Sequence, residues 1–139
     1  MAHVIHFEIS VPNPEQAVEF FSIVFGWSVD KLPDPVRYWQ LKPPASPGPQ
    51  GIPGGILESK TGQPRTSVTI QVESLEHTCA KVRNQGGTVV TEPRLVPGYG
   101  THVLCKDSQG IFFALIEPLT RNALRDERGD VPRTGEHAV

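Results

Sequence analysis

The residues with the clearest potential for chemistry are His6 and Glu8, which stand two positions apart near the start of the chain. Apolar and polar residues alternate around them from Val4 to Val11, and this period of two predicts a strand with one buried face. The two side chains then share the other face. An imidazole beside a carboxylate can hold a ligand by hydrogen bonds or act as a general base, so both are candidate catalytic residues. The structural alternative is a His–Glu pair that satisfies itself in the interior.

A repeat in the sequence identifies the elements that position this pair. Shifted by 61 residues, Phe7–Val11 falls on Val68–Val72. Each copy reads as a strand, a capped helix, a glycine and further strands, so the sequence predicts two βαβββ modules at about residues 3–58 and 66–118. Neither module could bury its helix and its sheet face alone, and we expect a single domain over residues 1–118. Further strands are expected at residues 27–31, 36–42, 52–58, 88–91, 99–106 and 111–117.

Helix signals follow the first strand of each module. Asn13 with Pro14 predicts a helix start and Gly26 predicts its end, while Ser74 predicts the start of the helix in the second module. The spacing of apolar residues is typical of half-buried helices. The residues expected to face the core are Ala17, Phe20, Phe21, Val24, Phe25 and Trp27 in the first module, and Leu75, Thr78, Cys79 and Val82 in the second.

The composition is that of an ordinary protein in a reducing compartment. The chain has 139 residues, a net charge of −2 and a hydrophobic fraction of 37%, which gives no reason to expect a nucleic-acid or membrane partner. It has no apolar run long enough to span a membrane and no N-terminal signal pattern. We therefore expect a cytoplasmic location, with Cys79 and Cys105 reduced and mostly buried. The proline-rich loop at residues 43–51 is a candidate lid, and residues 119–139 are expected to form a polar tail.

Several short motifs resemble those of one family. The matching segments are His6–Ile9, Asn13–Ala17, Phe25–Trp27, Gly54–Ile56 and Asp107–Pro118. In these segments and in its duplicated module the chain resembles the vicinal oxygen chelate superfamily, which includes glyoxalase I, extradiol dioxygenases, methylmalonyl-CoA epimerase and bleomycin-resistance proteins. The resemblance implies an α+β fold in which two βαβββ modules in tandem form curved mixed sheets around a cup. It also implies a homodimer.

The resemblance further implies a divalent metal ion in the cup, held at four positions that here are His6, Gly55, Ser67 and Ala114. Glycine and alanine have no donor atom in the side chain, and a neutral serine hydroxyl is a poor ligand. Transition ions at catalytic sites usually need about three ligands from His, Asp, Glu or Cys. We therefore expect no cofactor, and the alternative is a weakly bound divalent ion on His6 with Glu8 as a second donor.

The wall of the expected cup is polar but carries few charges. If Trp39 and Leu41 pack on the first helix, Tyr38 and Gln40 face the cup, and the repeat places Thr101 opposite Gln40. Such a wall suits a small organic ligand with few charges. The expected ligand-binding residues are Tyr38, Gln40, Ser67, Thr69, Gln71, Thr101, Phe112 and Ala114.

Two functions compete on these grounds. The favoured one is a small-molecule-binding protein of the glyoxalase/bleomycin-resistance type, because the metal-ligand side chains are missing while the cup is expected to be kept. The alternative is a lyase, isomerase or dioxygenase that acts on a small organic substrate, with His6 as metal anchor or general base and Glu8 orienting it. An accessory interaction module is a third possibility. The sequence leaves open whether the protein is an enzyme.

Overall fold

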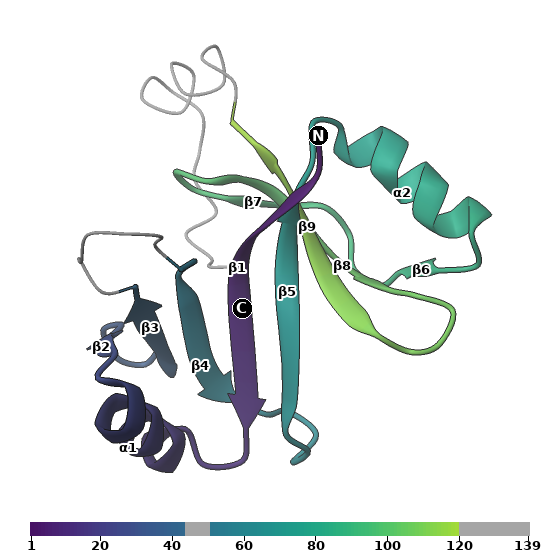
Figure 1. Cartoon of the computed structure of the whole chain (residues 1–139). Coiled ribbons are helices and arrows are strands. Elements are labelled where there is room, and N and C mark those ends of the chain that lie inside the picture. The colour runs from purple at the N-terminus through teal and green to yellow at the C-terminus, as the bar shows by residue number, and fades with distance from the viewer. Residues whose placement is uncertain (44–50, 120–139) are drawn as a thin grey trace. The chain divides into compact units, whose positions relative to one another are not determined.

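The computed structural model describes residues 1–43 and 51–119, which form two compact units (Figure 1). The first unit is Ile5–Val68, and the second combines Met1–Val4 with the described chain from Thr69 on. The expectations of a lid and of a polar tail rest on residues 44–50 and 120–139, which lie outside the described residues. No helix within the described ranges is long and apolar enough to cross a membrane.

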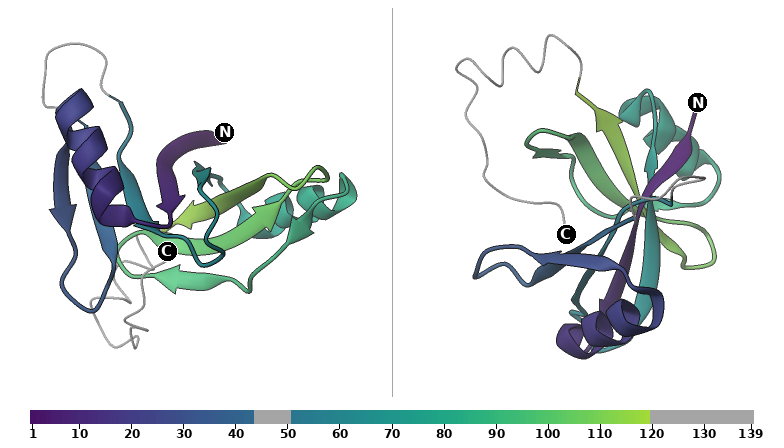
Figure 2. Two further views of the ribbon diagram at one scale, coloured as in Figure 1. Left: turned by 90° about the horizontal axis from the view of Figure 1, so that it is seen from below. Right: turned by 60° about the vertical axis from the view of Figure 1, so that its left-hand side comes forward.

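The first unit has the predicted βαβββ order. Its strands are arranged β2-β3-β4-β1, with β1 parallel to β4 and the other neighbours antiparallel. Figure 2 shows α1 lying along this unit's strands. The elements are β1 (His3–Val11), α1 (Pro14–Phe25), β2 (Ser28–Lys31), β3 (Tyr38–Lys42) and β4 (Gly54–Glu58).

The ends of both helices follow the predicted signals. Asn13 Oδ1 accepts a hydrogen bond from Gln16 N at 3.1 Å, and Pro14 is the first residue of α1. The helix ends at Gly26, whose φ of 68° is the left-handed conformation that glycine adopts without strain. Ser74 caps α2 (Leu75–Asn84) by accepting a hydrogen bond from His77 N at 3.2 Å.

The buried face of α1 differs from the predicted one. The helix packs through Ala17, Val18 and Phe21 on a core of β-strand residues that includes Trp39, Leu41 and Ile56. The prediction that Phe20, Val24 and Phe25 face the core is wrong, because their exposed fractions are 56%, 53% and 57%. Aromatic residues occupy two adjacent faces of the helix, and the stripe through Val18 is the one that meets the sheet. Phe25 still stacks on Trp27, with ring centroids 5.3 Å apart.

The second unit contains one strand more than predicted. The additional strand is β7, which pairs with β8, and the unit's other strands are arranged β5-β9-β8-β6. The core joins α2 to the sheet through Leu75 and Cys79 on the helix and Val103, Cys105 and Leu115 on the strands. The elements are β5 (Arg65–Gln71), α2 (Leu75–Asn84), β6 (Thr88–Val89), β7 (Arg94–Val96), β8 (Gly100–Lys106) and β9 (Phe112–Pro118).

The register inside each unit follows the repeat in part. Glu8 stands opposite Gly55 in the first unit, and Thr69 stands opposite Ala114 in the second. These two pairs are equivalent positions, as the sequence predicts. The fold is thus α+β, with parallel and antiparallel pairs in each unit.

The predicted equivalence of Gln40 and Thr101 is wrong. Gln40 stands opposite Gly55, but the residue opposite Ala114 is Leu104. Thr101 shares a strand face with Val103, which packs toward α2, so His102 rather than Thr101 lies on the other face. The extra strand β7 changes the loop lengths of the second unit. Beyond β7, a constant shift of 61 residues therefore no longer matches equivalent positions of the two units.

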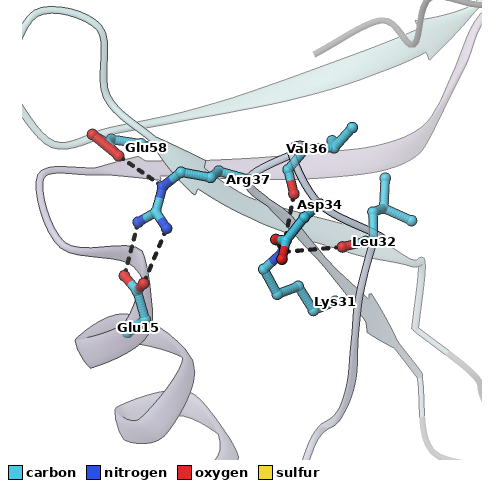
Figure 3. A network of polar contacts seen from close by, with 7 residues as sticks. All are labelled: Glu15, Lys31, Leu32, Asp34, Val36, Arg37 and Glu58. Atoms are coloured by element: carbon cyan, nitrogen blue, oxygen red, sulfur yellow. Dashed lines mark hydrogen bonds and ion pairs between the residues drawn. The ribbon is translucent and has the colours of Figure 1, made fainter.

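The last glutamates of β4 and β9 are anchored differently in the two units. Glu117 Oε1 accepts a hydrogen bond from Leu75 N, the first residue of α2, at 2.8 Å. The repeat places Pro14 at the matching position of α1, and proline has no N–H to donate. Glu58 instead forms an ion pair with Arg37 at 3.0 Å, and the same guanidinium holds Glu15 in the first turn of α1 at 2.9 Å (Figure 3).

Candidate functional site

One face of the first unit's sheet carries the predicted polar side chains. Phe7 and Ile9 of β1 pack toward α1, as do Trp39 and Leu41 of β3 and Ile56 of β4. Because side chains alternate along a strand, the residues between them lie on the opposite face. We call this the polar face. It consists of His6, Glu8, Ser10, Tyr38, Gln40, Gly55 and Leu57, with Lys42 of β3 and Ser28 and Asp30 of β2 at its edge.

Tyr38 joins the two candidate catalytic residues. Its hydroxyl donates a hydrogen bond to Glu8 Oε2 at 2.9 Å and lies 3.3 Å from His6 Nε2. Tyr38 is 7% exposed, while His6 and Glu8 are half-buried. Three residues singled out from the sequence therefore meet at one phenol oxygen. The structural alternative of a self-satisfied His–Glu pair is modified, since the phenol stands between the two groups.

The absence of a side chain at Gly55 makes room for this phenol. A Cβ atom built on Gly55 would overlap both the hydroxyl and the Cζ atom of Tyr38. The ring of Tyr38 therefore lies directly over the backbone of β4, which only glycine permits. Gly54 does the same for Phe7 on the opposite face, where an added Cβ would overlap the phenyl ring.

Burial acts on the ionisation of both partners. It lowers the pKa of His6 below its ordinary value, so the imidazole is neutral at pH 7. It raises the pKa of Glu8, and the hydrogen bond from Tyr38 offsets part of this rise. The lysine of the polar face, Lys42, forms an exposed ion pair with Asp30 at the edge of the face. Lys31 and Arg37 of the same unit lie over the Trp39 ring, 5.5 and 5.2 Å from its centroid.

The four positions that the resemblance assigns to a metal ion do not fit one. His6 is the only good donor among them. The space over Gly55 is filled by Tyr38, Ser67 offers a neutral hydroxyl from β5, and Ala114 in β9 has no donor atom. Across residues 1–43 and 51–119, no three His, Cys, Asp or Glu side chains are grouped so that they could hold an ion.

The other predicted residues divide between the units. Gln40 lies on the polar face and is half-buried. In the second unit Ile70 and Leu115 pack toward α2, which places their strand neighbours on the opposite face. The predicted ligand-binding residues on that face are Thr69, Gln71, Phe112 and Ala114.

A cavity of about 450 Å³ in the second unit includes one predicted residue, Gln71. Its amide nitrogen lies 3.5 Å from His3 Nε2. At its edge the N-terminal ammonium pairs with Glu73 Oε1 at 2.7 Å. That ion pair is exposed, and the half-buried Glu117 carboxylate in the lining already accepts a hydrogen bond from Leu75 N.

The sequence analysis did not identify the steric role of Gly55, which leaves room for the Tyr38 phenol. In the sequence, Gly55 stands out only as an expected metal position that has no donor atom. The available signal was the pair Gly54-Gly55 inside a predicted strand, because glycine in a strand marks the close approach of another group.

Comparison with known proteins agrees with this fold. The model of the Glyoxalase/Bleomycin resistance protein/Dioxygenase superfamily matches residues 3–115. The chain therefore belongs to this superfamily, and the resemblance noted from its sequence is confirmed. None of the curated protein sequences matches the chain.

Solved structures share the fold at low sequence identity. Methylmalonyl-CoA epimerase from Mycobacterium tuberculosis is 20% identical over 86% of this chain and 90% of that one, with a TM-score of 0.59. A methylmalonyl-CoA epimerase in complex with methylmalonyl-CoA and NH4+ is 16% identical over 86% and 96%, with a TM-score of 0.61. A hypothetical protein from Bacillus halodurans C-125 is 14% identical over 86% and 96%, with a TM-score of 0.60. At these identities the likeness shows the fold alone.

Proposed function

We propose that the chain is a small-molecule-binding protein of the glyoxalase/bleomycin-resistance type whose polar face takes an organic ligand without a transition ion. The observation that carries this proposal is the position of the Tyr38 hydroxyl. It is hydrogen-bonded to Glu8, lies near His6 and fills the space over Gly55. A face built this way offers hydrogen bonds rather than metal coordination.

The chemistry of the polar face favours a neutral ligand that bears oxygen or nitrogen. His6 is uncharged at neutral pH, Lys42 and Asp30 offset each other in an ion pair, and Glu8 is the remaining acidic group, so the charge of the face is zero or negative. An anionic ligand would have to compete with Asp30 for Lys42, the lysine of the face. Gln40 supplies both a donor and an acceptor, and Leu57 supplies apolar contact. Phenols, catechols and aromatic amides have the matching groups.

The test is a thermal-shift and calorimetric titration with phenol, catechol and benzamide, using benzoate as the charged analogue of similar shape. We expect the neutral compounds to stabilise the protein and benzoate to have no effect. This stabilisation by the neutral compounds should be lost in His6→Ala. It should be kept in His77→Ala, because His77 is exposed on α2. Equal stabilisation by benzoate, or a gain indifferent to His6→Ala, would contradict the proposal.

A second candidate is an isomerase that works by proton transfer, and the hydrogen-bonded group at Tyr38 favours it. His6 is a neutral base at pH 7, and Glu8 is a carboxyl group with a raised pKa. Both lie within hydrogen-bond reach of one hydroxyl that can pass a proton between them.

The epimerases that share the fold supply a test substrate for this candidate. Methylmalonyl-CoA that is incubated with the wild-type protein in D2O should incorporate deuterium, as seen by NMR. Methylmalonyl-CoA that is incubated with His6→Ala should not. Absence of exchange in the wild type would remove the epimerase form of this candidate. Exchange would also overturn the preference for neutral ligands, because this substrate is anionic.

The homodimer and the cytoplasmic location are part of the proposal. A cluster of exposed apolar side chains on α1 supports self-association, because soluble monomers rarely leave such a patch uncovered. Sedimentation velocity of wild type and Ile23→Asp should show a dimer that the charged variant weakens. The residues of this cluster are Phe20, Ile23, Val24 and Phe25.

A further inference from the structure

We infer that Tyr38 decides what the polar face binds, because its phenol stands where a divalent ion would otherwise be held by His6, Glu8 and a side chain at residue 55. This inference deepens the proposed function and rests on it. Tyr38 determines the ligand specificity of the face, and the absence of a side chain at Gly55 allows Tyr38 to occupy this position.

The first step is the convergence of two donor atoms on one point. Glu8 Oε2 and His6 Nε2 lie 2.9 and 3.3 Å from the same oxygen of Tyr38. An ion binds such atoms at about 2.0–2.2 Å, so modest side-chain shifts would bring both donors to an ion at this point. The phenol oxygen engages both donors and keeps the point occupied.

The second step concerns residue 55. Gly55 stands directly across from Glu8 in the parallel pair of β1 and β4. A side chain starting at its Cβ position would point into the Tyr38 hydroxyl. The phenol and a side chain at residue 55 therefore compete for one space, which is the space where the two donor atoms converge.

The third step is the number of ligands. With glycine at residue 55, the point at the Tyr38 hydroxyl is approached by one imidazole and one carboxylate, fewer than the three ligands that transition ions usually need. A carboxylate at residue 55 would complete a set of three once the ring of Tyr38 is removed.

The experiment compares divalent-ion binding by full-length wild type, Gly55→Glu, Tyr38→Ala and the double variant Tyr38→Ala/Gly55→Glu. Each protein is stripped with EDTA and titrated with NiCl2 and ZnCl2 by calorimetry and thermal shift, and circular dichroism confirms folding. Adventitious binding elsewhere is measured on each protein with His6→Ala added. Only the part of the binding that His6→Ala removes is counted.

We expect no His6-dependent binding in wild type and a loss of stability in Gly55→Glu, whose side chain meets the phenol. The double variant should regain stability and bind one Ni²⁺ at least about tenfold more tightly than Tyr38→Ala. A folded double variant that binds no more tightly than wild type would overturn the inference, as would one His6-dependent ion bound by wild type.

The single variant keeps the inference testable if the double variant does not fold. Tyr38→Ala should then show weak His6-dependent Ni²⁺ binding that wild type lacks, and the absence of any difference would overturn the inference. The proposed function is tested separately, with neutral organic compounds on wild-type protein. Its failure can therefore be told apart from failure of the role given to Tyr38.

Discussion

The hydroxyl of Tyr38 occupies the space that a Cβ atom at residue 55 would fill, so these two positions specify each other. Glycine at residue 55 lets the tyrosine ring lie on β4, and the ring in turn brings its hydroxyl to Glu8 and His6. The contact is local to the first unit. It links a backbone requirement to the chemistry that the polar face can offer.

The first prediction concerns the added methyl group in Gly55→Ala. It should lower the free energy of unfolding by about 1–3 kcal/mol, because the methyl displaces the phenol from a packed position. In the Tyr38→Ala background the same substitution should cost much less. Urea unfolding of the four proteins gives the coupling between the two residues. Gly51→Ala is the matched control, since a Cβ there meets nothing within 4 Å, and equal costs in both backgrounds would refute the coupling.

The second prediction follows from the raised pKa of Glu8. Between its ordinary value of 4.5 and its higher value in the folded state, the folded protein holds a proton that the unfolded chain has lost. Stability therefore falls as the pH rises through this window. Glu8→Gln cannot titrate and still offers an oxygen to Tyr38, so its stability relative to wild type should rise between pH 4 and pH 7. Urea unfolding across this range, with the exposed Glu76→Gln as control, measures the difference, and a flat difference would show that Glu8 is not perturbed.

The third prediction has the opposite sign and concerns His6. Its lowered pKa means that, below the ordinary value of 6.5, the unfolded chain takes up a proton that the folded protein resists. Stability should therefore fall as the pH drops below 6.5. His6→Gln should lose this part of the pH dependence, while His77→Gln on the exposed side of α2 should keep it. If the free energy of unfolding depended on pH in the same way in both variants between pH 5 and pH 7, the assignment of this pH dependence to His6 would be contradicted.

The fourth prediction compares the two glutamates that end β4 and β9. Glu117→Ala removes the acceptor for Leu75 N at the start of α2 and should cost about 1 kcal/mol, as loss of a helix cap does. Glu58→Ala breaks an exposed ion pair with Arg37 and should cost less, because such pairs contribute about 0–1 kcal/mol. Chemical denaturation of both variants decides the order. A larger loss in Glu58→Ala would mean that the Arg37 network supports α1 more than its exposure suggests.

The sequence predicted the parts of this site that depend on short-range pattern. Alternation along β1 placed His6 and Glu8 on one face, and the apolar partners Trp39 and Leu41 placed Tyr38 on the same side. These inferences hold because a strand has a strict period of two, whichever strands become its neighbours.

The parts that the sequence did not predict depend on contacts between strands. The overlap of Tyr38 with position 55 requires the register of β3 against β4, which alternation alone does not contain. The constant offset of the repeat puts Thr101 on the wrong strand face, because β7 changes the spacing of the second unit. The buried face of α1 was misjudged because Val18 and Phe20 both present apolar surface, and only the sheet determines which of them is covered.

We propose that the polar face centred on Tyr38 binds its ligand without a transition ion. The most direct test is elemental analysis of the metal content of untagged wild-type and His6→Ala proteins purified in parallel without chelators. We expect substoichiometric metal in both proteins, with no difference between them. One equivalent of a divalent ion in the wild type that is lost in His6→Ala would contradict it.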